Sequence, residues 1–452
     1  MRFSELDGKR IGVWGAGREI RSFAEQLARR LPSARIVAAA FDGPAPQDVP
    51  AALGAPDARV LTAPDTLVTG LSDCEVLVRS PGVPTHREEL RALRESGVAV
   101  TTATALWLAE REGEGVIGVT GTKGKSTTAA LIAHLARAAG RTVALAGNIG
   151  VPALDLLDGE RAQVTVVELS SYQIADLEVG PQVALVTNVF REHTDWHGSE
   201  DAYRADKLRL LGLPGVRVAV LNARDERLAA LDPDVPLVRC GQPDGWEATG
   251  AGIAFAGELR VAGAELPLRG EHNAQNLCGA LAALEAFGVR PAPLPDSLAG
   301  FRPLAHRLET VAEHDGVLWV NDSISTTPES TMAALASFPG REVVLIAGGL
   351  DRGQDYVGLA RALAVSGASV IGIPSTGPRL LEAARAAGMS SARAVNAADM
   401  ADAVARARAM ARAGTVVLLS PAAPSFDHYR DFEERGASFC AAACSVIVGE
   451  VS

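Results

Sequence analysis

A glycine-bounded loop that carries lysine and hydroxyl side chains is the part of this sequence with the clearest chemistry. The loop reads Gly121-Thr122-Lys123-Gly124-Lys125-Ser126-Thr127 and stands between an apolar run and a segment of helical period. In such a loop the backbone N–H groups and the following helix N-terminus bind phosphate, the lysine reaches the outer phosphates and the hydroxyl coordinates Mg2+. The spacing is that of a GTxGK[ST] loop and is shorter than GxxxxGK[ST]. We therefore predict a nucleoside triphosphate site.

Carboxylate and imidazole side chains that follow the next apolar runs could hold metal ions. Glu168 ends the run VTVVE, and a carboxylate at this place suits Mg2+. His193, Asp195 and His197 follow the later run 183–188. Since open α/β sheets place their ligands at the carboxyl ends of strands, these groups indicate a polar site. A surface glutamate and structural histidines are the alternatives that the residues alone leave open.

Two further features have no decisive chemistry of their own. Gly15-Ala16-Gly17 follows an apolar run, but Ile20 stands where a dinucleotide-binding GxGxxG motif needs its third glycine. NAD binding is therefore not expected, and the turn is either a phosphate-binding turn or a tight turn without a ligand. Lys207 lies on a predicted helix and would by itself be a solvent-facing residue.

The positions of these residues depend on parallel strands that alternate with helices. Apolar runs of about five to seven residues alternate with Ala/Leu/Arg-rich segments of helical period, which is the pattern of βαβ units. The segment 250–268 has a Gly-punctuated alternation and predicts a small antiparallel hairpin. The predicted strands are 10–14, 116–120, 164–167, 183–188, 216–221, 317–321, 343–347, 369–373 and 415–419.

The length and the order of these elements predict an α/β chain of three domains. A chain of 452 residues is too long for a single domain of ordinary size. Residues 1–103 are predicted to form an N-terminal Rossmann-like domain, residues 104–303 a central P-loop ATPase-like domain, and residues 304–452 a C-terminal Rossmann-like domain.

The composition excludes several classes of protein. Hydrophobic residues make up 48% and charged residues 21%, the balance of a globular enzyme and not of a disordered chain. No signal peptide and no apolar run long enough to span a bilayer are present, so we expect a cytoplasmic protein without a membrane partner. A net charge of −11 without a basic run argues against nucleic acid. The five scattered cysteines are interpreted as reduced core thiols.

Taken together, the motifs resemble those of the Mur ligases, and most closely the MurD-type branch that adds glutamate to UDP-N-acetylmuramoyl-L-alanine in peptidoglycan synthesis. The resemblance runs over the whole chain in the same order. Its markers are GTKGKST (121–127), GNIG (147–150), ELSSYQ (168–173), EHTDWHG (192–198), DKLRL (206–210), EHNAQN (271–276), AHRLE (305–309), NDS (321–323), GGLDRG (348–353) and LLSPAAPSFD (418–427).

The resemblance implies a site for ATP and two Mg2+ ions. It places Lys125 and Ser126 at the phosphates and the metal, Glu168 at the metal and His193 at a second metal ion. It matches Lys207 to a lysine that is carbamylated, and a carbamate would serve as a carboxylate-like ligand. Further ATP contacts are implied for Asn273, Asn276, Arg307 and Asp322. The catalytic set implied is Lys125, Asn148, His193 and Lys207.

The resemblance also implies two substrate sites, and we expect a monomeric enzyme. The UDP-linked substrate would lie at Gly15, Ala16, Gly17, Arg18, Ser80, Pro81, Gly82, Asn148, Ser170 and Gln173. The incoming glutamate would lie at Thr326, Arg352, Ser425 and Phe432. The reaction implied is phosphorylation of the alanyl carboxylate by ATP, followed by attack of the glutamate amine on the acyl phosphate.

One departure from the usual pattern bears on which glutamate is used. Where ordinary D-glutamate ligases read DSKATN, this chain reads Asp322-Ser323-Ile324-Ser325-Thr326, so a cation is replaced by Ile324. Together with WGAGRE, EHTDWHGSE and SPAAPSF, this resembles a variant subgroup that adds L-glutamate. The alternatives are the same ligation with D-glutamate, a folylpolyglutamate synthetase-like ligase, and a non-enzymatic ATP-binding protein.

Overall fold

The computed structural model describes residues 1–43, 45, 51, 53–190, 199–268, 270–302 and 305–448. The chain divides into two compact units, Met1–Arg302 and Pro303–Ser452. His193, Asp195 and His197 lie outside the described residues. Among the residues that are described, no helix is long and apolar enough to cross a membrane.

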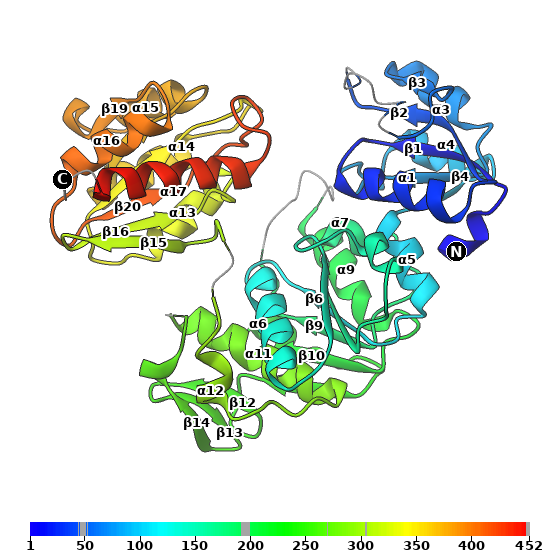
Figure 1. The fold of residues 1–452 in the computed structure, drawn as a ribbon, viewed down its shortest axis with the longest axis horizontal. Helices are drawn as coiled ribbons and strands as arrows, with labels where there is room; N and C mark the ends of the chain where they lie inside the picture. Colours follow the sequence, from blue (N-terminus) through cyan, green and yellow to red (C-terminus); the bar gives the residue numbers. More distant parts are fainter. Residues whose placement is uncertain are drawn as a thin grey trace. The chain divides into compact units, whose positions relative to one another are not determined.

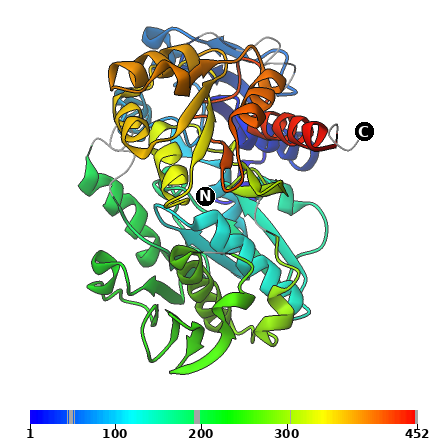
Figure 2. The same ribbon diagram turned by 90° about the vertical axis from the view of Figure 1, so that its left-hand side faces the viewer.

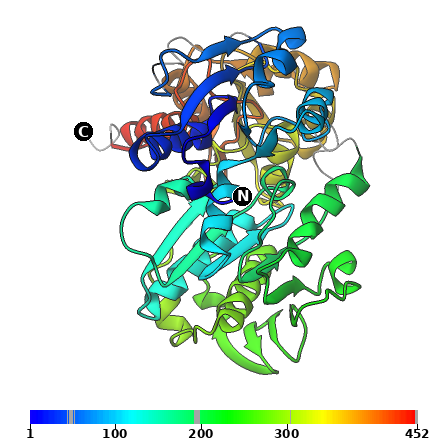
Figure 3. The same cartoon turned by 90° about the vertical axis from the view of Figure 1, so that its right-hand side faces the viewer.

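The first unit begins with a parallel sheet of five strands in the order β3-β2-β1-β4-β5, shown in blue in Figure 3. Helix α1 covers one face through Ile20, Phe23 and Leu27, and α3 and α4 cover the other through Leu67 and Leu90. The strands are β1 (Arg10–Trp14), β2 (Arg35–Ala40), β3 (Arg59–Leu61), β4 (Val76–Arg79) and β5 (Ala99–Thr101). The helices are α1 (Arg18–Arg30), α3 (Pro64–Leu71) and α4 (Glu88–Glu95).

A second parallel sheet of the same unit has six strands in the order β11-β10-β9-β6-β8-β7. Helices α6 and α11 lie side by side on one face, and α5, α7 and α9 contribute to the apolar cluster on the other (Figure 1). The strands are β6 (Val116–Thr120), β7 (Val143–Gly147), β8 (Val164–Glu168), β9 (Val183–Val186), β10 (Val218–Asn222) and β11 (Leu237–Cys240). The helices are α5 (Ala103–Arg111), α6 (Lys125–Ala138), α7 (Ser171–Ile174), α9 (Glu200–Leu208), α10 (Glu226–Ala229), α11 (Glu271–Phe287) and α12 (Leu294–Leu298).

The predicted hairpin at 250–268 is part of a small antiparallel sheet. Its strands are β12 (Trp246–Thr249), β13 (Gly252–Phe255) and β14 (Glu258–Ala262). The hairpin itself is β13-β14, and β12 adds a strand that the sequence pattern did not indicate. Trp246 explains this addition, since its ring packs against Phe255 and its Nε1 donates to Glu285 of α11 at 2.9 Å.

The second unit is a six-stranded sheet in the order β15-β16-β20-β17-β18-β19, parallel except for the β15-β16 pair. Helices α13, α14 and α15 pack on one face, while α16 and α17, orange and red in Figure 2, pack on the other. The strands are β15 (Glu309–His314), β16 (Val317–Asn321), β17 (Val343–Ala347), β18 (Ser369–Gly372), β19 (Ala394–Asn396) and β20 (Val416–Leu419). The helices are α13 (Pro328–Ala336), α14 (Val357–Ser366), α15 (Gly377–Ala386), α16 (Met400–Met410) and α17 (Phe432–Val448).

The predicted α/β class is confirmed, and each of the predicted strands is present within about two residues at its ends. One reading of the cysteines needs correction. Cys74, Cys240 and Cys278 are buried free thiols, but Cys440 is half-buried and Cys444 is exposed. Both lie on α17, where only one helical face is packed against the sheet, so position on the helix and not residue type decides their exposure.

Candidate functional site

The phosphate loop lies at a reversal of strand order in the six-stranded sheet of the first unit. From β6 the chain runs to β7, returns to β8 beside β6, and then continues to β9 on the other side of β6. Loops that leave the carboxyl ends of neighbouring strands in opposite directions open a crevice in which α/β proteins bind ligands. The loops after β6, β8 and β9 carry the phosphate loop, the Glu168 segment and Asn188.

Hydrogen bonds from the end of β9 hold the backbone of the phosphate loop. Asn188 Oδ1 accepts from Lys123 N at 2.8 Å, and its Nδ2 donates to Lys123 O at 3.0 Å. Thr187 Oγ1 donates to the same carbonyl at 2.7 Å. Gly121 has a φ of +152°, and a Cβ there would collide with the Thr187 hydroxyl. The loop is thus fixed by neighbours with no room for a side chain at Gly121.

The N-terminus of α6 follows the loop directly, as the sequence predicted. Gly124 caps the helix with a φ of +79°, a conformation that favours glycine. Lys125 is the first helical residue, and its Nζ donates to Thr122 O at 2.9 Å, while Ser126 beside it is buried. A Cβ on Gly124 would collide with the Asn276 amide, which places α11 directly against the loop. The geometry offers a helix terminus and a lysine to a bound anion.

Asn273 and Asn276 lie on the first turns of α11, at the phosphate loop. Asn276 Nδ2 donates to Asn273 Oδ1 at 3.3 Å. Asn273 also lines a small apolar pocket, whose other lining residues are Leu131, Leu266, Pro267, Leu268, Ala274 and Leu277. The structure therefore brings Asn276 to the loop and Asn273 beside it, both predicted ATP contacts, with apolar side chains next to Asn273.

Lys207 is not a solvent-facing residue. It lies on α9, is 2% exposed, and its Nζ donates to Gly121 O at 2.9 Å. The same Nζ lies 4.9 Å from the centre of the Tyr203 ring, whose hydroxyl is 2.8 Å from Thr122 Oγ1. Helix α9 therefore carries a buried amine to the backbone of the phosphate loop.

The carboxylate of Glu168 is buried and only half satisfied by the described residues. Glu168 ends β8 and is 1% exposed. Its Oε1 accepts from Asn148 Nδ2 at 3.0 Å, while its Oε2 has no hydrogen-bond partner in the described part of the chain. A buried carboxylate oxygen left over in this way fits a cation ligand. Within that same part, no three His, Cys, Asp or Glu side chains cluster as metal ligands, and the predicted ligand His193 lies outside it.

The two predicted UDP-binding loops of the five-stranded sheet meet at neighbouring strands. Gly15 N donates to Ala40 O at 2.9 Å, and a Cβ on Gly15 would lie 2.8 Å from Ser80 Cβ. Ser80 N donates in turn to Trp14 O at 2.7 Å, so the loops after β1 and β4 are joined. Arg18 follows Ala16 and Gly17 at the start of α1, and its Nη2 donates to Gly147 O at 3.4 Å. The loops that begin at Gly15 and at Ser80 thus start side by side.

Ser170 caps the N-terminus of α7, and it forms reciprocal hydrogen bonds with Gln173 of that helix. Gln173 Oε1 accepts from Ser170 N at 2.9 Å and from Ser170 Oγ at 3.0 Å. Gln173 Nε2 donates to Glu19 Oε1 at 2.6 Å and to Thr104 Oγ1 at 3.2 Å. Burial raises the pKa of Glu19, and the hydrogen bonds from Gln173 and Thr104 oppose that rise. The Gln173 amide is thus engaged within the protein, and its contact with a substrate stays a prediction.

The other predicted ATP contacts lie in the second unit. Asp322 follows β16, is 3% exposed, and accepts from Ser420 Oγ at 2.8 Å and from Leu308 N at 3.2 Å. Burial raises the pKa of this carboxyl, and the hydrogen bonds oppose the rise. Arg307 lies just before β15, and its Nε has no hydrogen-bond partner in the chain as described. Their contact with ATP stays a prediction.

The predicted glutamate-binding residues lie in loops at the carboxyl edge of the second unit's sheet. Thr326 follows β16, Arg352 follows β17 and is exposed, and Ser425 follows β20 and is buried. Phe432 begins α17, and its carbonyl accepts from Ser323 Oγ at 2.8 Å. Half-buried Ile324 lies in the same β16 loop as Thr326.

A buried arginine that the sequence did not single out connects these loops. Arg435 of α17 is fully buried and donates to Ser323 Oγ at 3.0 Å, to Ser323 O at 2.8 Å and to Ala423 O at 2.9 Å. Burial lowers the pKa of Arg435 to about 10, and Asp427 opposes the shift. Asn188 and Thr187 were likewise missed as loop supports. Their position at a strand end was the one signal that could have found them.

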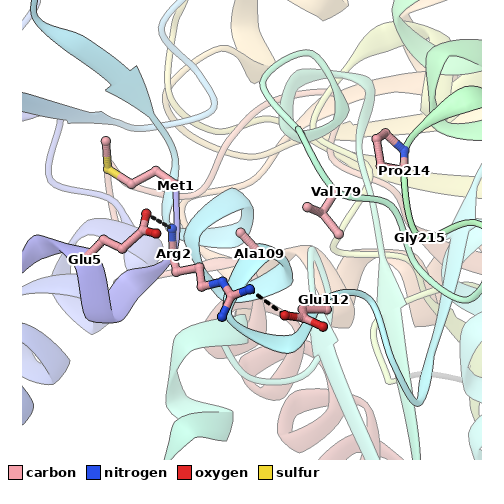
Figure 4. Close-up of a pocket in the computed structure, with 8 residues that line it drawn as sticks. All are labelled: Met1, Arg2, Glu5, Ala109, Glu112, Val179, Pro214 and Gly215. Atoms are coloured by element: carbon pink, nitrogen blue, oxygen red, sulfur yellow. Dashed lines mark hydrogen bonds and ion pairs between the residues drawn. The ribbon is translucent and has the colours of Figure 1, made fainter.

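A hollow of about 410 Å3 in the first unit lies away from this chemistry. It is lined by Met1, Arg2 and Glu5, together with Glu112 and Gly215 (Figure 4). Glu112 and Gly215 precede β6 and β10, at the amino edge of the sheet, whereas the phosphate loop leaves the carboxyl edge. Two of the lining residues form an ion pair, with Arg2 Nη2 lying 2.5 Å from Glu112 Oε1.

Comparison with known proteins adds to this geometry. Residues 119–284 match the Mur ligase middle domain, and residues 306–423 match the family described as Mur ligase, glutamate ligase domain. A UDP-N-acetylmuramoyl-L-alanine--L-glutamate ligase of a Micromonospora strain is 43% identical over 459 residues, covering 98% of both chains.

Two solved structures share the fold. The UDP-N-acetylmuramate-alanine ligase MurC of Thermotoga maritima aligns with a TM-score of 0.57 at 18% identity, over 97% of this chain and 100% of that one. A folylpolyglutamate synthase of Mycobacterium tuberculosis aligns with a TM-score of 0.54 at 17% identity, over 76% of this chain and 94% of that one.

Proposed function

This chain belongs to the Mur ligase family of ATP-dependent ligases, and we propose that it joins glutamate to UDP-N-acetylmuramoyl-L-alanine in peptidoglycan synthesis. The observation that supports this most directly is the buried contact of Lys207 with the phosphate loop. A protein that only bound ATP would need the loop but no second buried amine against its backbone. The proposal places the enzyme in the cytoplasm, acting as a monomer.

ATP binds, in this proposal, at the carboxyl edge of the β6 sheet. The backbone of Gly121 to Thr127 and the α6 terminus receive the phosphates, and the Lys125 amine neutralises the outermost one. Asn273 and Asn276 face the base, which suits side chains that both donate and accept. Arg307 and Asp322 are proposed as further ATP contacts.

The residues around the loop fit a divalent cation. Ser126 and Glu168 would hold Mg2+. The ligand atom of Glu168 would be Oε2, which accepts no hydrogen bond from a described residue. His193 and a carbamylated Lys207 are proposed for a second ion. When bound, Mg2+ supplies positive charge that screens the approach of two anions. Asn148 holds the Glu168 carboxylate in place through its 3.0 Å hydrogen bond.

The nucleotide half of the acceptor binds at the two joined loops of the β1 sheet, Gly15 to Arg18 and Ser80 to Gly82. Asn148, Ser170 and Gln173 are proposed as further contacts of the acceptor, between these loops and the phosphate loop. Arg18 supports this assignment, since its guanidinium lies at Gly147, next to Asn148. A cation at this corner suits a diphosphate.

The chemistry is transfer of a phosphoryl group followed by amide formation. An oxygen of the alanyl carboxylate attacks the γ-phosphorus, the bond to the β-phosphate oxygen breaks, and ADP leaves. The glutamate amine then attacks the acyl carbon, phosphate leaves, and the nitrogen loses a proton. The chain's contribution is to hold the two anions in line and to neutralise their charge through Lys125.

The incoming amino acid is proposed to be L-glutamate, bound by Thr326, Arg352, Ser425 and Phe432. The exposed Arg352 guanidinium can bind a carboxylate through two hydrogen bonds. Ile324, in the same loop as Thr326, stands where ordinary D-glutamate ligases have a lysine, so this chain lacks that cation. The name of the Micromonospora relative agrees with the L-isomer.

A ligation assay with UDP-N-acetylmuramoyl-L-alanine, ATP and Mg2+ tests the proposal when L- and D-glutamate are run in parallel. Product with L-glutamate and none with D-glutamate is the expected result. Turnover with D-glutamate alone contradicts the assigned handedness. Replacing the acceptor by a folate tests the folylpolyglutamate alternative, and turnover with the folate but not with the UDP-linked acceptor would overturn the proposed function.

A further inference from the structure

Arg79, the last residue of β4, is a fully buried arginine whose side chain lies under the loop that follows it. The loop folds back over the guanidinium so that one nitrogen, Nη1, donates to three of its carbonyls. The acceptors are Ser80 O at 3.2 Å, Pro81 O at 3.2 Å and Val83 O at 2.5 Å. A planar cation at the centre of a loop fixes the directions of its peptide groups.

The other end of the same guanidinium reaches helix α7, which follows β8 of the six-stranded sheet in the same unit. Arg79 Nη2 donates to Tyr172 O of α7 at 3.3 Å and forms an ion pair with Asp176 Oδ2. The Asp176 side chain is 7% exposed, and its Oδ1 lies 3.5 Å from Arg94 Nη2. Burial lowers the pKa of Arg79, and Asp176 opposes that shift. The Asp176 carboxylate thus compensates the buried charge of the guanidinium.

The position of α7 explains why the contacts of Arg79 with Tyr172 and Asp176 matter for the acceptor. Helix α7 begins at Ser171, three residues after Glu168, so the segment that carries the carboxylate of the phosphate site continues into the segment that Arg79 holds. The acceptor proposed for this enzyme is a single molecule with a nucleotide at one end and the reacting carboxylate at the other. Both ends of the acceptor can therefore bind at the same time only if the distance between the loop after β4 and the end of β8 is fixed.

We propose that Arg79 is a positioning residue for the nucleotide half of the acceptor, since its guanidinium shapes the Ser80–Val83 loop and anchors it to α7. The inference rests on the proposed function. It adds a residue that acts through the loop and that no motif of the sequence singled out. The guanidinium is fully buried and bonds to carbonyls of this loop, so its effect on the substrate is transmitted through Ser80 to Gly82.

Arg79→Lys tests this without removing the buried charge. Lysine keeps a cation opposite Asp176, but a single ammonium cannot serve the loop carbonyls and Tyr172 at once. We expect the KM for UDP-N-acetylmuramoyl-L-alanine to rise about tenfold or more, with kcat lowered less than about threefold and the KM for ATP within about twofold of wild type. A general loss of structure would lower the active fraction and all affinities together.

A matched control and a second variant keep the test decisive. Arg59→Lys changes an arginine of the same sheet that also bridges a carboxylate, Asp73, and a carbonyl, Gly70 O, away from the loop after β4. It should leave all three constants unchanged. Asp176→Asn keeps Arg79 and removes its charged partner, and it serves where Arg79→Lys fails to fold. It should raise the same KM selectively.

The outcomes separate this inference from the proposed function. Wild-type turnover with glutamate, combined with an unchanged KM for the acceptor in Arg79→Lys, overturns the positioning role alone. A rise in every KM together with a lower melting temperature also overturns it, because that is the effect of a purely structural residue. Absence of turnover in the wild type would instead contradict the proposed function.

Discussion

Substituting Glu168 by glutamine tests the proposed metal site with the smallest change of shape. The side chain is 1% exposed, and its Oε1 is already engaged by Asn148 Nδ2 at 3.0 Å. Glutamine can still accept that hydrogen bond through its own oxygen. The substitution therefore removes the charge and replaces Oε2, the oxygen that no described residue satisfies.

The size of the effect follows from this burial. Two unit charges about 4 Å apart interact with about 4 kcal/mol where the effective dielectric constant is about 20, and a divalent ion in direct contact gains more. Water that takes the place of the lost ligand recovers part of this. We therefore expect the Mg2+ concentration for half-maximal activity to rise about 100-fold, which corresponds to about 2.7 kcal/mol.

The assay is ADP release at saturating ATP, acceptor and glutamate while Mg2+ is varied, with the melting temperature of the metal-free proteins measured beside it. The metal-free Glu168→Gln protein should be at least as stable as wild type, because a buried charge with an unsatisfied oxygen has been removed. Glu114→Gln is the control, since Glu114 is an exposed ion-pair partner of Arg217 at the amino edge of the same sheet. A Mg2+ dependence identical to wild type in Glu168→Gln would show that this carboxylate does not hold the metal ion.

Two further substitutions address the buried amine of the phosphate site and the pH dependence of the second unit. Lys207→Ala should lower turnover at least about 100-fold, and short carboxylic acids should restore part of it by replacing a carbamate. An intact-mass measurement of active enzyme that finds only unmodified lysine would count against carbamylation. Asp322 has a pKa raised by burial, so its folded form binds a proton more tightly than the unfolded chain. Its contribution to stability is complete below about pH 4 and is lost as pH rises through the folded pKa, and Asp322→Asn should remove this slope from unfolding curves. The same slope in both proteins would exclude Asp322 as its source.

Much of the fold was predictable because its signals are local. Strands β1, β6, β16 and β17 have the predicted bounds, since each is a short apolar run closed by a polar or glycine-containing turn. The three-residue strands β3, β5 and β19 carry too little sequence pattern to be recognised alone. They exist because a neighbouring strand offers them hydrogen bonds, a property of the sheet and not of the segment.

Some features of the candidate site could likewise be read from the sequence, whereas others depend on the fold. The loop Gly121 to Thr127 could be read from sequence, because phosphate binding by a loop and a helix N-terminus involves consecutive residues. The burial of Lys207 could not, since nothing in its helix distinguishes it from a solvent-facing lysine. Sequence resemblance pointed to this lysine, but only the fold shows that its amine lies on the backbone of the phosphate loop.

The α/β class, the phosphate loop and the order of the family's motifs can all be read from the sequence, because each depends on neighbouring residues. The tertiary structure decided which polar groups meet. Glu168 pairs with Asn148 from another strand end, and Arg79 holds both its own loop and a helix 93 residues away. The physical reason is that a buried polar group must find a partner, and which partner is near depends on how the sheets and helices pack.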